Sequence, residues 1–299
     1  MGRRLHEFVV VALMAGGWLG CFGVGDTPDT LPQNFKPQVV LSDAGVLLGG
    51  DGGISGWRVS STDPERFAPS GDGQIVAAAE AADGIVVISA GHNGVNPQLW
   101  SHAATGWSMG PKLSHGPINQ LIVGPDGSLW TEGDRGVFRS TDGGQLWTAM
   151  PLPRNLRLGT VKLGRSGARL AYAGPELMVT VDNGTSWTAV DATSVVTTDG
   201  TWVVSDKDDV AMRVGRIIGD QVEWTAEVEG AWNPVSIRGS SKGVRILAIK
   251  KLSTQVELLQ GDEEGRGFVS TRIDAHPEWV GLGERVMWLD KRGRINTLP

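Results

Sequence analysis

Cysteine and tyrosine are almost absent from this chain of 299 residues, which has one of each, Cys21 and Tyr172. A single cysteine excludes an intramolecular disulfide, so the fold must be stable without that covalent link. The formal net charge is −6, and no basic stripe interleaved with aromatic residues occurs, so nucleic acid is not an expected partner. Glycine, in contrast, is abundant: its 43 residues are about twice the usual share, which is typical of a chain with many tight turns.

Motifs of several enzyme classes and cofactor sites are also missing. The sequence has no Gly-x-Ser-x-Gly elbow, which would indicate a serine hydrolase, and no glycine loop that would bind a phosphate. His92, His102 and His115 are spaced in a way that matches no zinc pattern. We therefore expect neither a cofactor nor a metal.

An export signal with an anchor is predicted at the N-terminus. Two arginines near the start precede an uncharged run, residues 8–20, and Cys21 follows directly, as in a lipoprotein signal. The residue three before the cysteine is Trp, where bacterial lipoproteins usually have Leu. We expect residues 1–20 to be removed and Cys21 to carry lipid; a plain signal peptide or an uncleaved anchor over residues 8–24 are the alternatives. All three place the folded part outside the cytoplasm, in the cell envelope.

The rest of the chain divides into a linker and a domain. Residues 21–37 combine prolines with Gly, Asp, Thr and Gln and have too little apolar content to fold alone, which predicts a flexible tether. Residues 38–299 are long enough for one large all-β domain.

An eight-residue pattern occurs twice, forty residues apart, at 140–147 and 180–187. An Asp side chain can accept hydrogen bonds from backbone N–H groups further along the turn, and the glycine supplies the positive φ that the turn needs. The Trp that follows opens the next strand and is expected to pack its ring on the neighbouring sheet. The matching positions, to which we assign a structural role, are Ser140, Asp142, Gly144, Trp147, Thr180, Asp182, Gly184 and Trp187.

These octets resemble the Asp-box, or BNR repeat, of sialidases, sortilin-type receptors and photosystem II assembly factors. The resemblance implies a β-propeller in which the box lies on the outer hairpin of a blade, away from the axial loops that bind ligands. It implies little about activity, because enzymes, receptors and assembly factors share the box.

Two further series of residues support blades of about forty residues. Aromatic residues stand at Phe67, Trp107, Trp147, Trp187, Trp224 and Phe268. Short apolar segments occur seven times, at residues 46–48, 85–88, 128–131, 169–173, 201–204, 244–249 and 285–289. We therefore predict an all-β, seven-bladed β-propeller of four-stranded antiparallel blades, with six or eight blades as alternatives. A strand around Phe35 would join the C-terminal strands and close the last blade.

Binding residues are expected on loops that join the second strand of a blade to its third, or one blade to the next. Each loop also has a simpler interpretation as a solvated turn, and the carboxylates at 206–209 lack the glycine and glutamate of a known calcium loop. Trp232 could be an exposed platform or part of the core. The candidates are His92, Asn93, Glu132, Asp134, Arg135, Arg154, Arg157, Asp206, Asp208, Asp209 and Trp232.

Sialidase chemistry is disfavoured because it requires a tyrosine nucleophile beside a carboxylate. Tyr172 lies in a segment predicted to be the second strand of its blade, with Glu176 across a turn, and the Phe/Tyr-Arg-Ile-Pro segment typical of sialidases is absent. We assign no catalytic residue and expect a non-catalytic scaffold or assembly factor of the envelope, which binds a protein through its axial loops. A glycan-binding propeller or a glycoside hydrolase with a carboxylate pair is the alternative; the oligomeric state stays open.

Overall fold

β-Strands dominate the part of the chain that this computed structural model describes. The described residues are 37–41, 46–49, 55–59, 64–67, 74–81, 84–90, 96–103, 105–114, 118–133, 136–150, 162–166, 169–173, 176–192, 194–207, 210–240, 242–251, 253–277, 280–283, 285–292 and 294–298. The predicted signal peptide, Cys21 and all but the last residue of the tether lie outside them. Within these ranges no helix is long and apolar enough to cross a membrane.

The described residues form six four-stranded antiparallel sheets, which are propeller blades, and one three-stranded sheet, each with its strands in sequence order. Blades 1 and 2 consist of β1 (Pro37–Leu41), β2 (Val46–Gly49), β3 (Ser55–Val59) and β4 (Pro64–Phe67), then β5 (Gln74–Ala81), β6 (Gly84–Ala90), β7 (Gln98–Ala103) and β8 (Gly106–Lys112). Blades 3 and 4 consist of β9 (Ile118–Val123), β10 (Leu129–Gly133), β11 (Gly136–Ser140) and β12 (Thr148–Ala149), then β13 (Lys162–Ser166), β14 (Arg169–Ala173), β15 (Leu177–Thr180) and β16 (Thr188–Val190).

Blades 5 and 6 consist of β17 (Val195–Thr198), β18 (Trp202–Asp206), β19 (Ala211–Ile218) and β20 (Gln221–Glu229), then β21 (Trp232–Ser240), β22 (Gly243–Lys250), β23 (Val256–Gly261) and β24 (Val269–Ile273). The C-terminal sheet consists of β25 (Val280–Leu282), β26 (Val286–Leu289) and β27 (Ile295–Leu298).

The prediction of seven four-stranded blades is wrong, because the described part of the chain forms six. The seven apolar segments do fall on second strands, those of the six blades and of the C-terminal sheet, but the last sheet has three strands. The strand predicted around Phe35 as the fourth strand of that sheet lies outside the described residues, and β1, the first described strand, pairs with β2 inside blade 1. The seven apolar segments therefore predicted where the second strands lie, but they did not show how many strands pair in each sheet.

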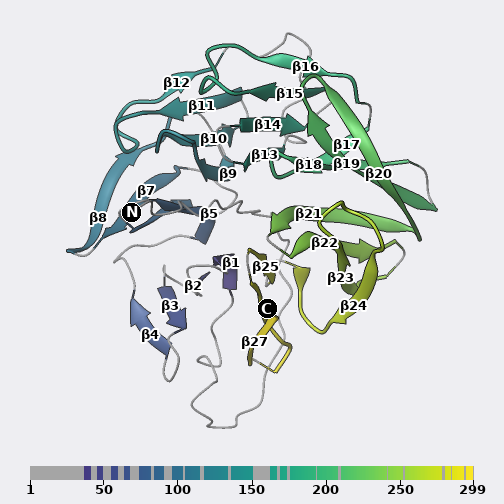
Figure 1. Ribbon diagram of the computed structural model, residues 1–299. Helices are drawn as coiled ribbons and strands as arrows, with labels where there is room; N and C mark the ends of the chain where they lie inside the picture. The colour runs from purple at the N-terminus through teal and green to yellow at the C-terminus, as the bar shows by residue number, and fades with distance from the viewer. Residues whose placement is uncertain are drawn as a thin grey trace, which may run out of the picture. The chain divides into compact units, whose positions relative to one another are not determined.

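The chain separates into two compact units, whose strands are labelled in Figure 1. One unit is Ile122–Ile273 and contains blades 4 to 6 with nearly all of blade 3. The other contains blades 1 and 2 and the C-terminal sheet, and within it β25 and β26 both contact β1. The first blade thus lies beside the last sheet without sharing a strand with it.

The second strands β6 and β22 are buried on both faces. In β22 the six residues from Gly243 to Ala248 are all buried, and β6 is buried from Ile85 to Ala90. A short apolar run bounded by turns is the pattern expected of such a strand. The innermost strands differ: β1, β5, β17 and β21 each contain a register shift, and in β21 it lies next to Pro234. A proline, which has no N–H to donate, is tolerated at such a bulge.

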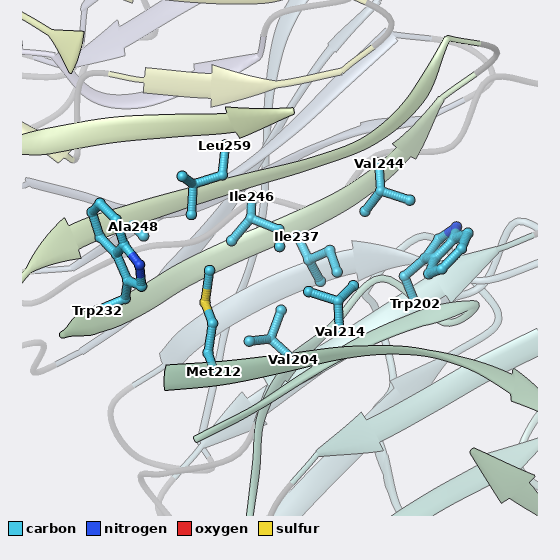
Figure 2. Close-up of a cluster of buried hydrophobic side chains, with 10 residues drawn as sticks. All are labelled: Trp202, Val204, Met212, Val214, Trp232, Ile237, Val244, Ile246, Ala248 and Leu259. Carbon is cyan, nitrogen blue, oxygen red and sulfur yellow. The ribbon is translucent and has the colours of Figure 1, made fainter. Parts of the chain in front are cut away.

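A core cluster of buried residues lies between blades 5 and 6 (Figure 2). Val204, Met212 and Val214 of blade 5 point toward Ile237 and Ile246 of blade 6, and the rings of Trp202 and Trp232 stand at opposite ends of the cluster. Fully burying one such aliphatic side chain contributes about 1.5–3 kcal/mol. The apolar faces of the two blades thus stabilise each other.

The two octets are turns that join the third strand of a blade to the outer fourth strand. In the first, the Ser140 hydroxyl donates to Asp142 Oδ1 (2.8 Å) and accepts from Gly144 N (2.8 Å), while Leu146 N donates to the same carboxylate (3.0 Å to Oδ1). The second repeats this geometry, with Gly184 N donating to Thr180 Oγ1 (3.0 Å) and Ser186 N to Asp182 Oδ1 (2.9 Å). Hydrogen bonds from the Ser186 hydroxyl, the Ser186 N–H and the Thr180 hydroxyl lower the pKa of Asp182 to about 2.

A third turn, between β23 and β24, uses the same device. Asp262 Oδ1 accepts from the backbone N–H of Arg266 (2.7 Å), four residues on, as Asp142 and Asp182 do in the octets. The aromatic residue that follows is Phe268 in place of Trp. The Asp of the pattern is kept, but the glycine, Gly265, follows it at three residues in place of two, which explains why the repeat is hard to see in the sequence.

The outer turns of blades 4 and 6 pack against the preceding blade. Trp187 of blade 4 meets Trp130 of blade 3 edge-on, with 6.3 Å between ring centroids and an interplanar angle of 80°. A Cβ at Gly184 would lie 2.4 Å from Trp130 Cη2, so only glycine fits under that ring. In the same way Gly265 lies against Trp202, and Phe268 packs on the blade 5–6 core.

We expect Gly184→Ala to destabilise the fold more than Gly143→Ala in the neighbouring octet. Both glycines have positive φ (80° and 72°), so either alanine costs roughly 1–2 kcal/mol of backbone strain. A Cβ at Gly143 would meet nothing within 4 Å, whereas at Gly184 it would displace Trp130 and cost about 1–3 kcal/mol more. Denaturant unfolding of both variants measures the difference, and equal destabilisation would contradict the packing described here.

We also expect Asp182→Asn to lower the Tm at neutral pH, with a difference from the wild type that shrinks as the pH falls from about 4 to about 2. The folded pKa is depressed to about 2, so the ionised carboxylate stabilises the fold above the unfolded pKa and stops doing so as pH falls through the folded value. Asp220→Asn, which removes an exposed carboxylate from the adjacent blade, controls for charge. A difference in Tm that stays constant from pH 6 to pH 2 would refute the assignment.

Candidate binding surface

The two edges of a blade have different roles. Strands alternate in direction, so the connections from first to second and from third to fourth strand share one edge, here called the turn edge. The octets lie there. The connections from second to third strand and from blade to blade lie at the opposite edge, here called the loop edge. All five loops that contain the predicted binding residues are connections of this second kind.

The loop edge of blades 5 and 6 joins three segments that are far apart in the sequence. Gly230 N donates to Val210 O (2.7 Å), which links the β20–β21 connection to the β18–β19 loop. Lys251 N donates to Ala231 O (2.6 Å), which adds the end of β22. Two of the predicted loops, around Asp206 and around Trp232, are therefore brought together by backbone hydrogen bonds.

Two ion pairs lie at this edge. Lys251 Nζ lies 3.5 Å from Asp206 Oδ1, and Lys207 Nζ lies 2.7 Å from both carboxylate oxygens of Glu227. Val210 is 67% exposed beside them. We call Asp206, Lys207, Val210, Glu227 and Lys251 the loop-edge surface of blades 5 and 6. A mixture of fixed charges and an exposed aliphatic group suits contact with another polypeptide.

Trp232 does not form the exposed platform that the sequence suggested as one possibility. Its side chain is 8% exposed, packs in the blade 5–6 core and donates from Nε1 to Glu229 O (3.0 Å) (Figure 2). Gly230 makes this possible, because a Cβ there would lie 2.4 Å from Trp232 Nε1. Trp232 is thus a core residue that orders the connection between the blades.

Glu132 is also buried, at 1% exposure in β10, which contradicts its assignment to an exposed loop. Asp206, in contrast, keeps 42% of its side chain exposed. The remaining predicted binding residues lie outside the described part of the chain: His92, Asn93, Asp134, Arg135, Arg154, Arg157, Asp208 and Asp209.

Tyr172 lies in β14, the second strand of blade 4, where it pairs with Leu163 and Met178. Glu176 is exposed at the turn before β15. Among the residues that the structure describes, no group of three His, Cys, Asp or Glu side chains is arranged to hold a metal ion.

Sequence reasoning missed two aspartates at the turn edge that join elements. Asp199 is 3% exposed, accepts from Thr201 N (2.9 Å) and Trp202 N (2.7 Å), and accepts from Gly239 N (2.5 Å) in the next blade. Asp126 accepts from Ser128 and forms an ion pair with Arg139. Burial raises the pKa of Asp126, but the hydrogen bonds from Ser128 and Arg139 outweigh it and hold that pKa below its ordinary value. The available signal is an Asp-Gly pair shortly before a Trp, at Asp126 and Asp199.

No family model and no curated protein matches the sequence. Solved structures do match it. A protein from Lactobacillus plantarum is 14% identical with a TM-score of 0.54 over 99% of this chain and 100% of that one. The β-propeller domain of Cps50 (Swd1) from Myceliophteria thermophila is 11% identical with a TM-score of 0.57 over 97% and 98%. Virginiamycin B lyase from Staphylococcus aureus, with quinupristin, is 16% identical with a TM-score of 0.53 over 97% and 99%.

PorZ, described as an essential surface component of the type-IX secretion system of Porphyromonas gingivalis, matches over 95% of this chain but 38% of its own length, with 14% identity and a TM-score of 0.54. At these identities the matches show the fold, which is a β-propeller. They include a lyase and a secretion-system component, so the fold alone selects no activity.

Proposed function

We propose that this chain is an exported, lipid-anchored propeller that binds a protein partner of the cell envelope through the loop-edge surface of blades 5 and 6. The observation that carries the proposal is the joining of residues 206, 207 and 210, residues 229–232 and residues 250–251 into one surface by backbone hydrogen bonds and ion pairs. A surface that is ordered before binding loses little conformational entropy when a partner docks.

Export and anchoring are supported by the sequence at residues 3–21, with Cys21 as the lipidated residue and residues 21–37 as the tether. The octets, with their resemblance to the Asp-box, support a rigid scaffold. PorZ shows that a propeller of this fold can belong to a bacterial surface machine. A flexible lead to a membrane would present the loop edge to neighbouring envelope proteins.

The test is cross-linking in native host membranes with the full chain tagged at its C-terminus, followed by identification of proteins recovered in near-stoichiometric amount. The double variant Asp206→Lys/Lys251→Asp reverses the charges of one ion pair. We expect it to reduce recovery of the partner at least several-fold without a change in Tm. The control is Asp274→Lys/Lys291→Asp, which reverses an exposed ion pair (3.1 Å) in the other unit and should leave recovery unchanged.

The proposed surface would be contradicted if the Asp206→Lys/Lys251→Asp variant recovered as much partner as the wild type. It would also be contradicted if this variant and the control lost the partner equally. Turnover of a panel of fluorogenic glycosides would instead favour the glycoside hydrolase alternative. The variant Cys21→Ser reports on the anchor: the proposal requires that it no longer sediments with membranes.

A further inference from the structure

β20 has an unusual outer edge for this propeller. It is the outermost strand of blade 5 and pairs with β19. With nine residues it is the longest outer strand among those described, whereas β12 and β16 have two and three (Figure 1). Apart from an isolated bridge between Gln221 and Asp191, its other side has no strand partner in the described part of the chain. Such an edge presents backbone N–H and C=O groups that can pair with an added strand.

The strand is held firmly from both sides. Val222 and Trp224 pack on the core that blade 5 shares with blade 4, and Ala226 and Val228 pack on the core shared with blade 6. The change of face occurs at a bulge, where Thr225 Oγ1 donates to Gly265 O (3.0 Å) in the next blade. The edge is therefore a rigid template that needs no ordering when another chain pairs with it.

The charge along this edge has one sign. Glu223, Glu227 and Glu229 are exposed, Asp220 precedes them, and residues 219–230 contain no lysine or arginine. Charges facing each other across a strand pair contribute when opposite and destabilise when alike. The edge thus disfavours a second copy of itself and favours an added strand that carries cations.

Lys207 already shows how a cation docks here. Its ammonium lies 2.7 Å from both oxygens of Glu227, although the two residues are twenty positions apart in the sequence. Glu229 follows two residues later on the same face of the strand, and neither it nor Glu223 has an ion-pair partner among the described residues. An incoming lysine would find one carboxylate free and would compete with Lys207 for the other.

We propose that β20 is a docking strand for an extended polypeptide segment with Lys or Arg at alternate positions. The segment adds a fifth strand to blade 5 along residues 222–229, and its cations contact Glu227 and Glu229. Since Lys207 and Glu227 belong to the loop-edge surface of blades 5 and 6, the inference rests on the proposed function and names the kind of partner segment that this surface takes.

The experiment measures binding to the full chain of a fluorescent, terminally blocked octapeptide that alternates Lys and Thr. Two further peptides separate charge from backbone pairing: one replaces Lys by Glu, and the other keeps Lys but is N-methylated at alternate residues, which removes donors to the strand edge. The chain variants are Glu227→Gln/Glu229→Gln, Lys207→Ala and, as a charge-matched control, Glu263→Gln/Glu264→Gln in the exposed β23–β24 turn.

We expect saturable binding of the Lys peptide alone, with slower hydrogen exchange in the fragment that covers residues 221–229. Removing Glu227 and Glu229 should weaken binding by about 2- to 5-fold per carboxylate, which corresponds to an exposed ion pair. Lys207→Ala should tighten binding by a similar factor, because it frees Glu227. The Glu263/Glu264 control should bind like the wild type.

Three results would overturn the inference: equal binding of the N-methylated peptide, which would show attraction without strand pairing; weaker binding of Lys207→Ala; or an equal loss in the control variant. The proposed function fails separately. Capture of a native partner that depends on Asp206 and Lys251, together with no binding of the Lys peptide, would overturn this inference alone. Peptide binding without any captured partner would overturn the proposed function alone.

Discussion

The structure depends on the packing of outer turns against the preceding blade, as the turns of blades 4 and 6 show. A single four-stranded sheet cannot cover its own apolar faces, so neighbouring blades must cover each other. Two contacts show the device most clearly: Gly184 and Trp187 lie against Trp130, and Gly265 lies against Trp202. In both cases an arginine from the third strand stacks over the Trp, Arg139 at 5.5 Å and Arg216 at 5.9 Å from the ring centroid. The Asp turns hold the glycine at the position where the Trp ring of the preceding blade packs on it.

This arrangement separates stability from binding. The carboxylates of Asp142, Asp182 and Asp262 are occupied by backbone N–H groups at the turn edge. At the loop edge, in contrast, side chains such as Asp206 and Lys207 are exposed and are not needed by the inter-blade core. A sequence change at the loop edge is therefore expected to lower the free energy of unfolding only slightly, so that the loops can vary while the fold is kept.

Much of the blade could be predicted from the sequence, because a forty-residue period follows from local turn chemistry and from aromatic residues that recur at the same place in each blade. The aromatic residues at Trp107, Trp187, Trp224 and Phe268 all pack on the cores between blades. The blade count could not be read in this way, since the last repeat has a second strand but only three strands in its sheet. The burial of Glu132 was not predicted, and Trp232 was left open between an exposed platform and the core, because the sequence around a residue does not show burial by a neighbouring blade. Asp199 was missed for the same reason: its acceptor role toward Gly239 spans forty residues.

The central claim is that a protein partner contacts the loop edge and not the turn edge. Two valines allow a matched test, because Val210 at the loop edge and Val181 in an octet are 67% and 69% exposed. A photo-cross-linking amino acid placed at either position reports which edge the partner touches in intact cells. The account predicts a discrete adduct from position 210 and none from position 181. An adduct from position 181 alone, or equal adducts from both, would contradict it.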